Sequence, residues 1–178
     1  MEENKIMSPQ IKGLLIALIV IILGIAGYLT GLGFSTWFNW VVNAIMFAAI
    51  LIACVHFANQ KQGFVTFGNV FLHGFKITAV VAIIVLVYTL LAFTVLFPDM
   101  KEKIFEMQAA QMEKQGMDED KMEQATSAMK NFFWPITIGV TIFGTLIWGA
   151  ISSLIGAAVA KKKKFNQLNF HPVKDKHS

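Results

Sequence analysis

The stretch Pro135–Ala160, PITIGVTIFGTLIWGAISSLIGAAVA, decides the fold of this chain because it is apolar and carries no charged residue. A helix needs about 20 residues, at a rise of about 1.5 Å each, to cross a bilayer. The stretch is therefore long enough to span a membrane. The lysine run Lys161–Lys164 follows it directly. We predict a transmembrane helix over residues 135–160 that ends at this basic run.

Small side chains recur at every fourth position of this stretch. Residues four apart lie on the same face of a helix, so they form one narrow ridge. Helices in a bilayer gain little from apolar burial, and close approach of their backbones over small residues is what holds them together. We predict that this ridge is the packing face of the span, made of Thr137, Thr141, Thr145, Gly149, Ser153 and Ala157.

The composition of the chain excludes most water-soluble classes of protein. Of its 178 residues, 56% are hydrophobic and 16 are Phe, more apolar surface than a soluble domain of this size can cover. All 15 basic residues are Lys, whereas nucleic-acid recognition depends largely on Arg, so we expect no nucleic-acid partner. The single cysteine, Cys54, allows no intramolecular disulfide, and we expect it to be a small buried apolar residue. We expect no metal or cofactor.

Three further uncharged runs predict three further spans, over residues 13–32, 37–57 and 77–97. The first is longer than the apolar core of a signal peptide and lacks a small-residue cleavage pattern, so we interpret it as a span. Gly27 and Gly31 form a GxxxG pair there, which predicts a close helix crossing. A hinge at these glycines is the alternative.

The connection between the second and third spans contains a stripe of phenylalanines at helical spacing, Phe64, Phe67, Phe71 and Phe75. This pattern predicts a short interfacial helix before the third span, with Thr66 as its N-cap. His73 and Lys76 are three residues apart and lie on one face. They either anchor the chain at the interface, with Lys76 extending toward water, or contact the anionic group of a lipid.

Residues 99–131 form the only long polar segment between spans. One weakly apolar stripe precedes Gly116 and a second follows it, and glycine is a typical helix stop. We therefore predict a helical hairpin that projects from the membrane, its two apolar faces packed together. A disordered acidic loop is the alternative, because the segment is rich in Glu, Lys and Gln.

Taken together, these features predict one all-α integral membrane domain over residues 1–178. It has four transmembrane helices, an interfacial helix before the third span and an extramembrane hairpin between the third and fourth. Most lysines that flank the spans fall on one side by parity, and cytoplasmic loops are enriched in Lys. We expect both termini in the cytoplasm and the hairpin outside. Lys161–Lys164 would then face anionic lipid headgroups.

The sequence resembles a bacterial membrane family catalogued as domain of unknown function 4199. The resembling segments are TFGNVFLHGFK at Thr66–Lys76, LFPD at Leu96–Asp99 and GAISSLIGAAVAKKKK at Gly149–Lys164. The resemblance implies a small multi-span protein of the bacterial inner membrane. It implies no catalytic residues.

The sequence is compatible with three functions. The first is a non-enzymatic accessory protein that binds a membrane-protein partner or further copies of itself through helix packing and the hairpin. The second is a small transporter or oligomeric channel, although the spans lack the acidic groups that usually bind coupling ions. The third is an interfacial enzyme that modifies lipids, for which His56, His73 and Lys76 are the only titratable candidates. We expect no enzymatic activity.

Overall fold

The computed structural model describes residues 7–61 and 65–169, with side chains described as far as Ala160. Every regular element in these ranges is helical. The elements are α1 (Pro9–Leu29), the 3₁₀ turn η1 (Leu32–Phe34), α2 (Thr36–Gln60), α3 (Phe67–Leu91), the π-helical turn η2 (Ala92–Leu96), α4 (Met100–Lys114) and α5 (Glu119–Asn169).

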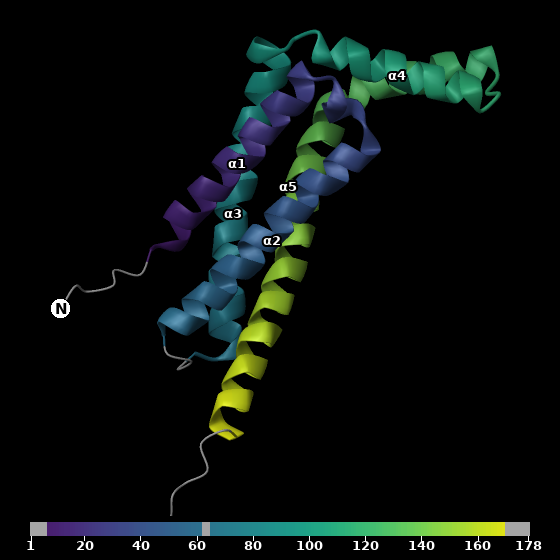
Figure 1. Ribbon diagram of the computed structural model, residues 1–178. Coiled ribbons are helices and arrows are strands. Elements are labelled where there is room, and N and C mark those ends of the chain that lie inside the picture. The colour runs from purple at the N-terminus through teal and green to yellow at the C-terminus, as the bar shows by residue number, and fades with distance from the viewer. Residues whose placement is uncertain (1–6, 62–64, 170–178) are drawn as a thin grey trace, which may run out of the picture.

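Within these described residues, four helical segments are long and apolar enough to cross a membrane. They are Pro9–Leu29, Thr36–Gln60, Phe67–Leu96 and Glu119–Ala160. Figure 1 shows the four running side by side, with the start of α1 and the end of α5 toward the same end of the bundle. The predicted all-α fold, with four helices long and apolar enough to span a membrane, is confirmed for the described residues.

Helix starts follow local capping chemistry. Ser8 caps α1 by accepting a hydrogen bond from the Ile11 amide at 3.4 Å, and Pro9 occupies the first turn, where its missing N–H costs nothing. Thr66 caps α3 and accepts from the Asn69 amide at 3.2 Å. Thr66 is thus the N-cap that the sequence predicts. The first span begins earlier than predicted, because the Ser8–Pro9 signal sets its start.

The core of the bundle lies between α3 and the other three spans, with α5 and α1 as its main neighbours. Ile50 of α2 and Ile77 and Val81 of α3 are fully buried there. Large apolar side chains such as Ile83 and Val140 point outward and are about two-thirds exposed. Such an outward apolar surface suits a bundle surrounded by lipid.

The expected interfacial helix is not a separate element. α3 runs without a break from Phe67, so the phenylalanine stripe forms the first turns of the span itself. Its two glycines in this segment, Gly68 and Gly74, both lie inside the helix and do not end it. The stripe residue Phe64 lies outside the described residues.

The segment between the third and fourth spans forms a helical hairpin, with Gly116 at φ +70° in the turn. Its second helix and the fourth span are one element, since α5 continues through Pro135. A proline inside a helix removes one backbone hydrogen bond and allows a bend. Figure 1 shows α5 running beside α4 at first and then turning along the bundle, so that the hairpin lies across the spans.

Candidate functional site

The candidate site surrounds His73, which lies in the first turns of α3 and is only 6% exposed. Its ring stacks on that of Phe57 from the end of α2, with centroids 3.9 Å apart and planes 7° apart. Lys12, one turn into α1, places its Nζ 3.4 Å from His73 Nε2. Three spans therefore meet at this one imidazole.

The contact with Lys12 bears on the protonation of the His73 ring. With Lys12 as an ammonium group, which donates and cannot accept, Nε2 is the accepting nitrogen. In that arrangement the ring is neutral and carries its proton on Nδ1. This Nδ1–H remains a donor, because Lys12 is the only hydrogen-bond partner of the ring among the described residues.

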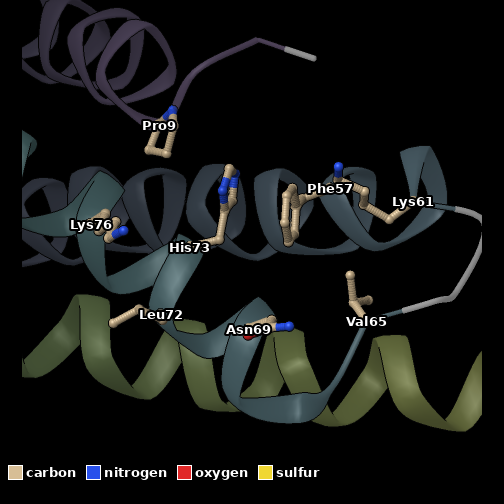
Figure 2. A pocket seen from close by; sticks show the side chains of 8 residues that line it. All are labelled: Pro9, Phe57, Lys61, Val65, Asn69, Leu72, His73 and Lys76. Carbon is tan, nitrogen blue, oxygen red and sulfur yellow. The ribbon is translucent and has the colours of Figure 1, made fainter.

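A pocket of about 390 Å³ opens beside the stacked rings. Figure 2 shows Lys61 and Lys76 on opposite sides of the Phe57–His73 pair. The described residues that line the pocket include no carboxylate; they are Pro9, Phe57, Lys61, Val65, Asn69, Leu72, His73 and Lys76. The two residues singled out from the sequence, His73 and Lys76, thus line one basic pocket.

Other titratable groups do not join this pocket. His56 is exposed and does not line it, because it precedes Phe57 on the helix and points to another side. Across residues 7–61 and 65–169, no group of three or more His, Cys, Asp or Glu side chains is arranged to hold a metal ion. Among the described residues, the pocket is therefore basic, with two lysines and no carboxylate in its lining.

The ridge of small residues on α5 falls into two parts. Gly149, Ser153 and Ala157 are buried, and Gly149 lies directly against Thr78 of α3. The three threonines at positions 137, 141 and 145 are only partly buried, toward the hairpin end of the span. The close contacts therefore gather in the half of the bundle that carries the pocket.

Cys54 belongs to the same packed region. It is fully buried, and a Cβ added to either Gly74 or Gly156 would clash with its side chain. Its Sγ also lies 3.9 Å from the Val70 carbonyl oxygen. α2, α3 and α5 thus come together around one small thiol, where a larger side chain would separate them.

The two glycines singled out in the first span have different roles. Gly27 is buried against Phe38 and Gly33, so it does allow a close approach. Gly31 lies beyond the end of α1, at φ +73°, and nothing approaches the position of its missing Cβ. The prediction that both residues form one helix-packing pair is wrong for Gly31, which is a turn glycine.

The family model described as "Protein of unknown function (DUF4199)" matches residues 12–162. The chain belongs to this family. No curated protein and no solved structure matches the chain. The match includes the pocket residues from Phe57 to Lys76 and begins at Lys12, so Pro9 is the one described lining residue outside the family's region.

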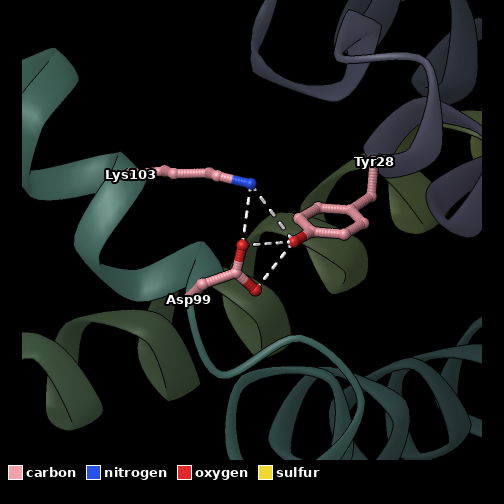
Figure 3. A network of polar contacts seen from close by, with 3 residues as sticks. All are labelled: Tyr28, Asp99 and Lys103. Atoms are coloured by element: carbon pink, nitrogen blue, oxygen red, sulfur yellow. Dashed lines mark hydrogen bonds and ion pairs between the residues drawn. The ribbon is translucent and has the colours of Figure 1, made fainter.

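A second polar cluster lies at the opposite end of the bundle, inside the same DUF4199 region (Figure 3). The hydroxyl of Tyr28, at the end of α1, donates to the Asp99 carboxylate, with its oxygen 2.7 and 2.8 Å from the two carboxylate oxygens. Lys103 Nζ lies 2.7 Å from Asp99 Oδ2. The Tyr28 ring also packs on Phe97, with centroids 4.0 Å apart. This cluster fixes the start of α4 against α1.

The sequence alone did not single out Lys12, Phe57, Lys61 or Tyr28 as site residues. Lys12 resembled a flanking charge outside the first span. The Ser8–Pro9 pair was a signal that could have placed Lys12 inside the helix, since Ser is a common N-cap and Pro is favoured at the first helical position. Nothing in the local sequence marked the other three.

Proposed function

We propose that this protein is a non-enzymatic accessory protein that binds another membrane protein through the hairpin of α4 and the first turns of α5. The observation that carries the proposal is the position of the hairpin. It extends sideways beyond the bundle (Figure 1), and α4 contains no buried residue. In a membrane, such an arm reaches over the neighbouring lipid, where the extramembrane part of a partner would lie.

Two contacts support a fixed rather than a loose arm. Phe133 of α5 is buried and packs edge to face on Phe105 of α4, with centroids 5.5 Å apart. Lys101 places its Nζ 5.0 Å from the centroid of the same Phe133 ring, a favourable cation–π distance. An arm held in one orientation loses little entropy when it binds.

The charge of the hairpin favours a protein partner over the membrane surface. Residues 99–131 contain eight acidic residues and five lysines. A net negative arm is repelled by anionic headgroups, whereas a basic protein surface attracts it. Its exposed apolar residues Met107 and Phe132 would supply the apolar contacts within such an interface.

The proposal includes a location and an orientation. We place the chain in the bacterial inner membrane with both termini in the cytoplasm, Lys161–Lys164 at anionic headgroups, and the hairpin on the outer side. Gly149 packs against Thr78, and Gly156 packs against Cys54. This close packing supports a purely structural role for the middle of the bundle.

A photo-crosslinking amino acid at Met107, in native membranes, tests the proposal. We expect it to capture one predominant membrane protein, identified by mass spectrometry. The double variant Glu106→Lys/Glu113→Lys should reduce this capture, because it reverses the charge of the arm. The same crosslinker at Val140, an exposed residue of the fourth span, is the matched control. Capture of only lipid or copies of the same chain at Met107 would contradict the proposal.

A further inference from the structure

We propose that the pocket between α1, α2 and α3 binds a phosphate-bearing anion, either the headgroup of an anionic phospholipid or free phosphate. This assignment goes beyond the proposed function, because it gives a ligand to the end of the bundle opposite the hairpin. It rests on the charge, the donor groups and the position of the pocket.

Positive charge converges on this pocket from three helices. Lys61 ends α2, Lys76 belongs to α3, and both line the pocket. Lys12 of α1, which is not among the described lining residues, places its Nζ 3.4 Å from His73 Nε2. Two lysines at the pocket and a third beside its imidazole, with no carboxylate among the described lining residues, attract an anion.

The burial of Lys12 is a further reason to expect an anion at this pocket. It is only 8% exposed, and a buried cation is costly unless an opposite charge lies close by. Among the described residues, the only ion pair joins Lys103 to Asp99 at the other end of the bundle. An anion bound beside His73 would supply the compensating charge for Lys12.

The donors around the pocket suit the oxygens of a phosphate. Lys61 and Lys76 offer ammonium groups, the neutral His73 ring keeps its Nδ1–H, and Asn69 adds a side-chain amide. Hydrogen bonds from charged donors to an oxyanion are about twice as strong as neutral ones. The stacking of Phe57 on His73 holds the imidazole in place, so this one donor is positioned before a ligand arrives.

The position of the pocket fits a headgroup. It lies at the start of α1, the end of α2 and the start of α3, all of which are candidate spans. The ends of spans lie at the depth of lipid phosphates. Leu72 and Val65 give the pocket an apolar side, where the first carbons of the acyl chains would lie.

Native mass spectrometry of the full chain, purified in detergent, tests the proposal with phosphatidylglycerol and phosphatidylcholine as probes. We expect one phosphatidylglycerol retained per protein molecule and weaker retention of phosphatidylcholine, whose choline group the lysines repel. The variant Lys61→Gln/Lys76→Gln should weaken retention at least tenfold, since each charged hydrogen bond is worth about one order of magnitude in affinity. The matched control is Lys114→Gln/Lys121→Gln in the hairpin, which should retain lipid as the wild type does.

A second experiment separates the two sources of phosphate and uses only the wild-type protein. Inorganic phosphate is titrated while the melting temperature of the protein is followed, with chloride at matched ionic strength. Stabilisation by phosphate without any lipid preference assigns the pocket to free phosphate. Lipid retention without this stabilisation assigns it to a headgroup. Equal retention of both lipids, unchanged by Lys61→Gln/Lys76→Gln and without phosphate stabilisation, overturns the proposal.

Discussion

At the scale of single residues, the bundle depends on the absence of side-chain atoms at a few positions. Gly149 of α5 lies so close to Thr78 of α3 that an added Cβ would overlap the threonine side chain. Thr78 cannot easily move away, because it is fully buried and donates a hydrogen bond to the Gly74 carbonyl at 3.0 Å. Gly144, five residues earlier on the same helix, has nothing within 4 Å of the same position.

We therefore expect Gly149→Ala to destabilise the protein by about 1–3 kcal/mol, the usual cost of overpacking. Gly144→Ala should change the stability little, which makes it the matched control. Thermal melting of the purified protein in detergent measures both. Thr78→Ala should relieve only part of the penalty in the double variant Gly149→Ala/Thr78→Ala, because alanine keeps the Cβ that would lie 2.6 Å from the added atom. Equal effects of the two glycine variants would show that the Gly149–Thr78 contact contributes nothing specific.

The Gly149–Thr78 contact shows which features of single residues the sequence can predict. The four-residue spacing on α5 marks Gly149 because packing of membrane helices requires small residues. It could not reveal that Lys12 meets His73 or that Tyr28 meets Asp99, since these partners lie 61 and 71 residues apart. Such contacts arise from the arrangement of whole helices, and a local sequence pattern does not predict them.

At the scale of elements, the start of α4 is tied to the end of α1 through Asp99. Hydrogen bonds from Lys103, and then from Tyr28, lower the pKa of the Asp99 carboxyl below its ordinary value of 3.8. The ionised carboxylate is thus favoured by the docked arrangement. Its stabilising contribution is present above the ordinary pKa and is lost as the pH falls through the lowered value of the folded state.

A titration of the protein carrying ¹³C-labelled aspartate measures this linkage. We expect Lys103→Gln to raise the pKa of Asp99 toward 3.8, and Tyr28→Phe to raise it by less, following the order of the two causes. Tyr28→Phe keeps the ring on Phe97, so packing is preserved. Asp99→Asn identifies the resonance. An unchanged pKa in both variants would show that the cluster in Figure 3 does not form in solution.

The helices also show which helix boundaries could not be predicted from the sequence. The change from a polar, charged segment to an uncharged one suggested a hairpin separate from the fourth span, whereas α5 continues through Pro135. A proline inside a helix costs one hydrogen bond but does not have to end it. In the same way, the phenylalanine stripe before the third span merges with α3, because a helical period continues across both segments.

At the scale of the whole molecule, charge is divided between the two ends of the bundle. Lys12, Lys61 and Lys76 lie at one end, with the lysine run at the close of α5 on the same side by parity. The acidic hairpin lies at the other end (Figure 1). Positive charge near span ends favours the cytoplasmic side, while a long segment is translocated largely regardless of its charge.

This asymmetry predicts the orientation of the chain, and enzyme fusions in a bacterial host measure it. Alkaline phosphatase folds only after export, so its fusion after Ser178 should be inactive and its insertion at Gly116, in the exposed hairpin turn, should be active. A cytoplasmic reporter such as β-galactosidase at the same two sites should give the reverse pattern, which controls for expression. Active phosphatase after Ser178 would place the pocket on the outer side, where its lysines would oppose the positive-inside bias.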